Sequence, residues 1–206
     1  MSDVARALYQ EHYTAISQYV DILASTGVEW GVIGPREVDR LWDRHVLNGA
    51  ALADLLPQGS TVVDVGSGAG IPGIPLAVLR PDLQLTLLEP LLRRFNFLTQ
   101  TVENLGITNI SVVRGRAEEH TARYDVVTAR ALAPLGRLVE WCDPLRGPGG
   151  VILALKGRSA ADELAAAAPV LARLKLSGQV LTARAHQDAE PATVVRIAPR
   201  TSVTTR

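Results

Sequence analysis

This sequence of 206 residues is short of several residue types, and each shortage excludes a class of protein. It has one cysteine, Cys142, so neither an internal disulfide framework nor a cysteine metal cluster is expected. No apolar run reaches the roughly 18 residues that a membrane-spanning helix needs, and no basic-then-apolar leader begins the chain. We therefore expect a soluble, cytoplasmic protein without a membrane partner or a metal ion.

Lysine is also scarce, because Lys156 and Lys175 are the only lysines among 21 basic residues, which leaves 21 − 2 = 19 arginines. Such a bias is typical of genomic composition, so the scarcity of lysine gives no argument for RNA binding. The 21 acidic residues bring the formal net charge to zero, so global charge gives no argument for nucleic acid and none against a local basic patch. The length is enough for one domain with a sizeable core.

The stretch 61–73 is the strongest signal in the chain. Its β-branched beginning predicts a short buried strand. Spaced glycines follow at once, and glycine lets a backbone turn tightly and approach a ligand closely. Pro72 and Pro75 then favour the first turn of a helix. The pattern predicts a strand, a glycine-rich turn and a helix N-terminus, the first βα unit of a nucleotide-type site.

Two cofactor chemistries share this shape. Gly68, Gly70 and Gly73 fit the G-x-G-x-x-G pattern of dinucleotide enzymes, a weak signal alone. Asp64 stands where those enzymes normally carry an apolar residue, and an acid there resembles the first motif of class I S-adenosylmethionine (SAM) methyltransferases. SAM has a cationic amino-acid head and no pyrophosphate, which suits an acid. Asp64 could instead cap the turn after it. We favour SAM as the cofactor, with S-adenosyl-L-homocysteine as its product.

Beyond the glycines, strand and helix patterns alternate, which predicts a mostly parallel sheet with helices on both faces. The expected strands are 61–65, 83–88, 110–113, 124–129, 151–155, 179–183 and 194–197, the last two antiparallel at the edge. The expected helices are 91–105, 135–142 and 160–174, with a turn at 147–150. The fold class is α/β: a Rossmann-like, seven-stranded class I SAM-dependent methyltransferase.

An N-terminal helical extension precedes this sheet. Apolar residues recurring at three and four predict amphipathic helices over 3–24 and 35–56, joined by a loop at 25–34. Arg36, Arg40 and Arg44 form one basic stripe, either a solvated face or an RNA contact. We expect 1–206 to form a single domain, with N-terminal helices in 1–57, a SAM-binding core in 58–200 and a frayed tail in 201–206.

Charged residues stand at the carboxyl ends of the predicted strands, where open α/β sheets bind ligands. Asp64, Glu89, Arg130 and Lys156 occupy four such ends, and the turn before Ala117 follows a fifth. Glu89 lies about 20 residues past the glycines, the position of an acid that holds ribose hydroxyls. The sequence therefore predicts one site at this edge of the sheet.

Several longer motifs accompany these residues. They are Arg44-His45-Val46-Leu47, the run from Asp64 to Leu76 with its Gly-Ile-Pro-Gly-Ile-Pro-Leu extension, Arg80-Pro81, Leu87-Leu88-Glu89, Arg130-Ala131, Trp141-Cys142 and Leu155-Lys156-Gly157. By these motifs the chain resembles the GidB/RsmG family, bacterial 16S ribosomal RNA guanine-N7 methyltransferases. The likeness spans about residues 8 to 200, and the extension is much more specific than the generic motif.

The resemblance implies a role for each matching residue. The cofactor-binding residues would be Asp64, Gly66, Gly68, Gly70, Ile71, Glu89, Ala117, Glu118 and Arg130, with Glu89 at the ribose and Ala117 and Glu118 at the adenine. The catalytic residues would be Arg130, Lys156 and His45, with Arg130 beside the methionine end and the entering base. The family also implies 16S ribosomal RNA or the small subunit as partner, and an effect on streptomycin susceptibility. We expect a monomer.

The chain departs from the family pattern at three places. The loop 29–33 replaces a usual Asn-Leu-Thr, Asn48 and Gly49 replace an acid and a serine, and Glu89 replaces an aspartate. Other interpretations also stay open: His45 could cap a helix or lie in the core, and Cys142 beside Trp141 could be a buried small hydrophobe.

The expected chemistry needs no general base, because guanine N7 already carries a lone pair. Catalysis then rests on positioning, which can contribute roughly 7–11 kcal/mol. Three alternatives remain: a small-molecule SAM methyltransferase with the N-terminal helices as a lid, a nicotinamide-dependent oxidoreductase built on the glycines, and a SAM-binding regulator without catalysis.

Overall fold

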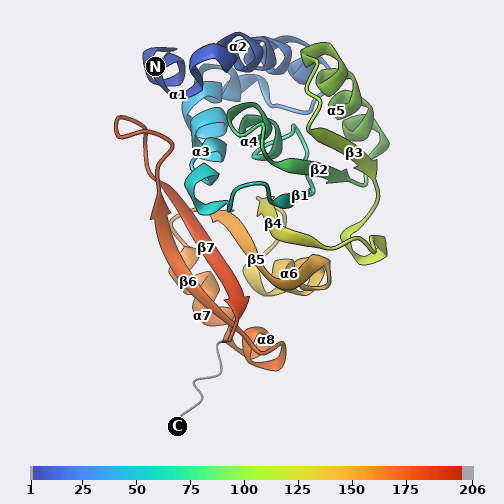
Figure 1. Cartoon of the computed structure of the whole chain (residues 1–206), viewed down its shortest axis with the longest axis vertical. Coiled ribbons are helices and arrows are strands. Elements are labelled where there is room, and N and C mark those ends of the chain that lie inside the picture. Colours follow the sequence, from blue (N-terminus) through green and yellow to red (C-terminus); the bar gives the residue numbers. More distant parts are fainter. Residues whose placement is uncertain (1, 201–206) are drawn as a thin grey trace.

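The computed structural model describes residues 2–200, so the tail predicted at 201–206 lies outside the described residues. The strands are β1 (Thr61–Val65), β2 (Gln84–Glu89), β3 (Ile110–Arg114), β4 (Tyr124–Arg130), β5 (Arg146–Lys156), β6 (Leu176–Ala183) and β7 (Ala192–Pro199). They form one sheet in the order β3-β2-β1-β4-β5-β7-β6 (Figure 1). The first five strands pair in parallel, and β7 runs antiparallel to both neighbours, which confirms the predicted sheet.

Helices cover both faces of the sheet (Figure 1). They are α1 (Ser2–Tyr9), α2 (Tyr13–Ile22), α3 (Asn48–Ala50), α4 (Gly73–Leu79), α5 (Leu92–Leu105), α6 (Leu135–Cys142), α7 (Ala160–Ala166) and α8 (Ala168–Arg173). Neighbouring strand residues point to opposite faces, so Val62 joins the core under α1, α2, α4 and α5, while Val63 joins the core under α6 to α8. This alternation buries β1 on both sides, inside the sheet between β2 and β4.

The two helices predicted for the N-terminal extension are broken into shorter pieces. The first is interrupted at Gln10, whose φ is +46°, by a short 3-10 turn before α2. Helical structure then continues through a π-helical turn, Leu23–Gly27, into the segment predicted as a loop. Gly27 does not mark a helix end, because its φ is not positive, and a Cβ there would make only ordinary contact, 3.6 Å from the Phe97 ring.

The second predicted helix, over 35–56, is likewise a succession of tight and wide turns. A 3-10 helix (Pro35–Arg40) is followed by a π-helical segment (Leu41–Leu47), α3 and another 3-10 turn (Ala53–Leu55). Hydrophobic spacing predicted a helical segment here, but it does not distinguish these helix types. The changes of pitch bring His45 to the edge of the sheet where the strands end.

Two tyrosines tie the extension to the glycine-rich segment. The Tyr19 hydroxyl donates to the carbonyl of Ala69 at 2.7 Å, and the Tyr9 hydroxyl donates to the carbonyl of Pro75 at 3.2 Å. Both tyrosines are fully buried or nearly so. The extension therefore holds the backbone of the glycine turn and of α4 from outside the sheet.

Two predictions in the C-terminal half are wrong in detail. The segment 147–150 was predicted as a turn but belongs to β5, where it forms a bulge opposite Tyr124. Glycine is required there, since a Cβ on Gly150 would lie 2.9 Å from the Tyr124 carbonyl oxygen. The single helix predicted over 160–174 is divided into α7 and α8, because Pro169 lacks the N–H that would continue it.

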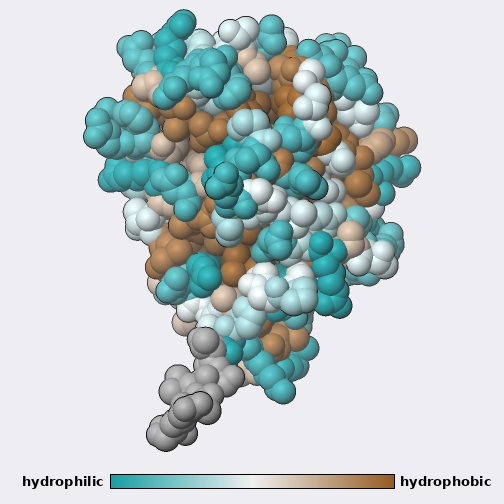
Figure 2. Space-filling model, in the orientation of Figure 1, coloured by the Kyte–Doolittle hydropathy of each residue, from teal (hydrophilic) through white to brown (hydrophobic). Residues whose placement is uncertain are grey.

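The surface carries few large exposed hydrophobic side chains. Those exposed among residues 2–200 are Leu91, Leu92 and Val180, and the face in Figure 2 mixes hydrophilic and hydrophobic residues. Over the same residues, no helix combines the length and apolar character needed to cross a bilayer.

Candidate active site

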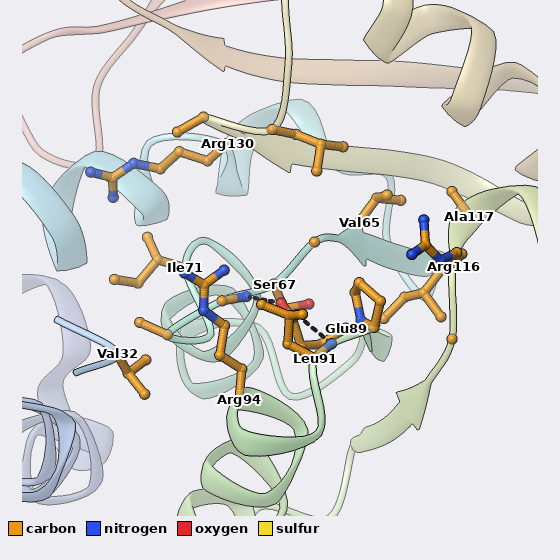
Figure 3. A pocket seen from close by; sticks show the side chains of 18 of the residues that line it. Val32, Val65, Ser67, Ile71, Glu89, Leu91, Arg94, Arg116, Ala117 and Arg130 are labelled. Carbon is orange, nitrogen blue, oxygen red and sulfur yellow. Dashed lines mark hydrogen bonds between the residues drawn. The ribbon is translucent and has the colours of Figure 1, made fainter. Parts of the chain in front are cut away.

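A cavity of about 560 Å³ lies at the carboxyl ends of β1, β2 and β4 (Figure 3). Its volume falls in the range of small-molecule sites, about 300–1,000 Å³. The predicted site residues that line it are His45, Gly66, Gly68, Ile71, Glu89, Ala117, Glu118 and Arg130. Asp64, Gly70 and Lys156 are outside this lining. The structure thus brings most of the predicted residues together.

The glycine turn is shaped so that a ligand can approach its backbone. Gly66, Gly68 and Gly70 have φ of +68°, +59° and +95°, conformations that residues with a side chain rarely adopt. A Cβ on Gly66 would lie 2.5 Å from Leu132 Cδ1, so the turn also needs glycine for space. A Cβ on Gly73 would collide with the Leu87 side chain, which explains the last glycine by helix–strand packing.

Glu89 fixes the geometry at the end of β2. Its carboxylate is buried, with Oε2 accepting a hydrogen bond from the Gly68 N–H at 2.9 Å and Oε1 from the Leu91 N–H at 3.0 Å. These bonds tie the glycine turn to the start of α5. Each carboxylate oxygen can accept more than one bond, so Glu89 retains capacity toward the cavity.

Asp64 lies behind the turn and is fully buried. Its Oδ2 accepts a hydrogen bond from the Gly73 N–H at 3.2 Å. Burial raises the pKa of Asp64 to about 7, against the lowering effect of that bond. Asp64 therefore helps to start α4, as a turn-capping residue would, and one of its oxygens still lacks a partner.

Arg130 ends β4 and carries the opposite charge. Burial lowers the pKa of its guanidinium, and the charge of Asp64 acts on it in the other direction. Over residues 2–200, Arg130 Nη1 and Asp64 Oδ1 are the buried side-chain atoms without a hydrogen-bond partner. One is a donor and the other an acceptor, so the pair matches a zwitterionic amino-acid group such as the methionine end of SAM.

His45 comes from the N-terminal extension and completes one wall of the cavity. Its Nε2 lies 2.8 Å from Glu37 Oε2. Burial and then the charge of Arg130 lower the pKa of His45, against the effect of Glu37. Glu37 also pairs with Arg44 at 3.5 Å. His45 therefore lies at the cavity wall beside an acid and does not cap a helix, and its catalytic role stays a prediction.

Lys156 occupies a different place from the one expected. Its Nζ donates to the Ala133 carbonyl at 2.7 Å and pairs with Glu163 Oε2 at 2.7 Å, with only 8% of the side chain exposed. The predicted contact between Lys156 and a substrate stays a prediction.

Several residues of the site were not predicted. Arg94, Arg116, Leu132 and Trp141 line the cavity as well. Arg94 extends from α5 toward the cavity in Figure 3. Their positions depend on how helices and loops close over the sheet, which the sequence does not show locally. The one available signal was Arg94 itself, an arginine in the first turn of the helix that follows β2. Among the described residues no group of histidine, cysteine and acidic side chains is arranged to hold a metal ion.

The sequence comparisons agree with this site. A sequence model of GidB, described as rRNA small subunit methyltransferase G, matches residues 12–192. A protein of Streptomyces coelicolor named ribosomal RNA small subunit methyltransferase G is 56% identical over 173 residues, covering 82% of this chain and 72% of that protein. A protein of the same name from Thermobifida fusca is 50% identical over 207 residues, covering 99% and 87%.

Solved structures share the fold at low identity. A SAM-dependent methyltransferase from Aquifex aeolicus superimposes with a TM-score of 0.57 and 15% identity, covering 80% of this chain and 98% of that one. A precorrin-6y C5,15-methyltransferase from Geobacter metallireducens gives 0.55 and 16%, covering 82% and 91%. With the glycine turn and its charged neighbours, these matches show that the chain belongs to the GidB family of SAM-dependent methyltransferases, described as rRNA small subunit methyltransferase G.

Proposed function

We propose that this protein transfers the methyl group of SAM to N7 of a guanine in the decoding-region loop of 16S ribosomal RNA. The observation that carries the proposal is the cavity, where a glycine turn open to close approach lies between Glu89 and Arg130. Relatives named for small-subunit ribosomal RNA support that substrate. We also propose that the chain acts as one domain and as a monomer in the cytoplasm.

The residues of the cavity fit SAM along its length. Arg130, which lines the cavity, would take the carboxylate of the methionine end, and Asp64, behind the turn, would place negative charge toward its ammonium. Glu89 would accept from the ribose hydroxyls. The backbone at Ala117 and Glu118 would border the adenine, above an apolar wall that includes Leu88.

The cofactor supplies an electrophilic methyl group when bound. Guanine N7 has a lone pair and needs no deprotonation, so the chain needs no general base for this reaction. The work of the protein is to hold the base in line, to exclude water and to keep the ring from rotating. Arg130 could donate to guanine O6 and leave N7 free, and His45 lies on the same wall as a neutral imidazole.

Arginines around the cavity suit the RNA backbone. Arg94 and Arg116 line the cavity, and within residues 2–200 neither forms an ion pair with an acid. SAM is a cation, so these arginines favour an anion that enters with the substrate. Phosphates beside a flipped or looped base would supply that charge.

Product mapping tests the proposal directly. The protein is incubated with labelled SAM and either unmodified 16S RNA or small subunits that lack the modification, and the methylated nucleoside is identified. We expect 7-methylguanosine at one site, and none with Gly66→Val, whose side chain would collide with Leu132. Label on an exocyclic amine, or RNA binding that is weak and independent of salt, would contradict it and favour a small-molecule substrate.

A further inference from the structure

Glu163, in the first turn of α7, gathers three hydrogen bonds at the ends of β4 and β5. Its Oε2 accepts from Lys156 Nζ at 2.7 Å and from the Leu135 N–H at 3.0 Å, while Oε1 accepts from the Ser159 hydroxyl at 3.1 Å. Burial would raise the pKa of Glu163, but the bonds and the charge of Lys156 outweigh it and leave the pKa lowered. Glu163 is therefore an ionised acceptor.

These bonds converge on the loop between β4 and α6. Lys156 Nζ also donates to the carbonyl of Ala133 in that loop. Leu135, which donates to Glu163, is the first residue of α6 and directly follows the loop. The loop begins at Ala131, whose φ of +52° is unusual for a residue with a side chain. The loop is thus held at both its middle and its end by one ion pair.

The same loop forms part of the cavity wall. Ala131 and Leu132 line the cavity, and Leu132 packs over Gly66, where an added Cβ would lie 2.5 Å from Leu132 Cδ1. A shift of the loop would move Leu132 against the glycine turn and move the backbone that follows Arg130. The ion pair lies behind this wall, since neither Lys156 nor Glu163 lines the cavity.

We propose that Lys156 and Glu163 act together as a clamp that positions the 131–134 loop for methyl transfer, an inference that rests on the proposed function. Both are positioning residues, and neither contacts the base. A substrate-binding role for Lys156 would require its ammonium to leave Ala133 and Glu163, where it is largely shielded from solvent. In the clamp, the Lys156 ammonium instead holds the 131–134 loop from the side that faces away from the cavity.

Lys156→Met and Glu163→Gln test the clamp. Lys175→Met is the matched control because it makes the same change at an exposed lysine, and Glu140→Gln changes an acid in an exposed ion pair with Arg173. We expect each clamp variant to lower kcat about 10- to 100-fold, the scale of a small misplacement. RNA affinity should change by less than about threefold, and the double variant should lose little more than either single one.

Hydrogen exchange supplies a readout that does not depend on activity. We expect the Leu135 amide to exchange at least roughly tenfold faster in both clamp variants, with Lys156→Arg restoring part of the protection and part of kcat. Lys156→Met with lost RNA affinity and unchanged exchange at Leu135 would overturn the clamp. Wild-type protein that methylates no ribosomal RNA would instead refute the proposed function, and the exchange result would still decide whether the clamp exists.

Discussion

Removing the hydroxyl of Tyr19 should weaken both the fold and the cofactor site. The Tyr19→Phe change leaves the ring in place and deletes the hydroxyl that donates to the buried carbonyl of Ala69. A buried acceptor left without its partner costs about 1–3 kcal/mol. For a chain of this length, about 2 kcal/mol corresponds to a fall in Tm of roughly 4–8 °C.

The same change should raise the Kd for SAM severalfold, because Ala69 belongs to the turn that Tyr19 holds. Thermal unfolding and calorimetric titration measure the two effects. Tyr13→Phe is the control: Tyr13 stacks on Trp42, and its hydroxyl has no hydrogen-bond partner among the described residues. Equal Tm values for the two variants, or an unchanged Kd in Tyr19→Phe, would refute the coupling between extension and turn.

Four further predictions concern the side chains of Glu89, Asp64 and Cys142. Glu89→Ala should weaken SAM binding by about 1.5–3 kcal/mol, the scale of bonds to a charged group, and wild-type affinity in a calorimetric titration would contradict the ribose role. Because burial raises the pKa of Asp64 to about 7, its carboxylate forms as the pH rises, so the Kd for SAM should fall roughly tenfold between about pH 6 and 7.5; Asp64→Asn should lack this dependence in titrations across that window. The same raised pKa should lower the free energy of unfolding as the pH rises from 3.8, the ordinary pKa of an aspartate, to about 7, because the unfolded chain loses this proton first. Denaturant unfolding at both ends of that pH range measures the change. Cys142→Ser should keep methyl transfer largely intact, because burial raises the pKa of that thiol to about 12 and no covalent adduct is needed; a folded variant that binds both substrates without transfer would point to C5 chemistry.

The parts of the site that could be predicted are those with local signals. The glycine turn follows β1 directly, and Glu89 and Arg130 are the last residues of β2 and β4, so finding the strands placed all three on one edge. The antiparallel edge strands also have a local signal, the short apolar runs near the end of the chain.

What could not be predicted depends on contacts between distant segments. The partner of Lys156 lies on a helix whose orientation no local pattern determines, so the lysine was assigned to the substrate. The π-helical turn that begins at Leu41 packs against α1, α2 and α3, and hydrophobic spacing does not encode its pitch. The sequence placed Tyr19 only on an apolar stripe and gave Tyr9 no role, because their acceptors lie 50 and 66 positions later in the chain.

The anchors of the N-terminal extension also set an order of events during synthesis. The segment up to residue 57 emerges from the ribosome before the carbonyls of Ala69 and Pro75 that hold it. The first strand to emerge, β1, lies inside the sheet, and its neighbours β2 and β4 arrive later on either side. The apolar faces of the nascent extension therefore stay uncovered until the glycine turn has emerged, which leaves them open to non-native contacts during synthesis.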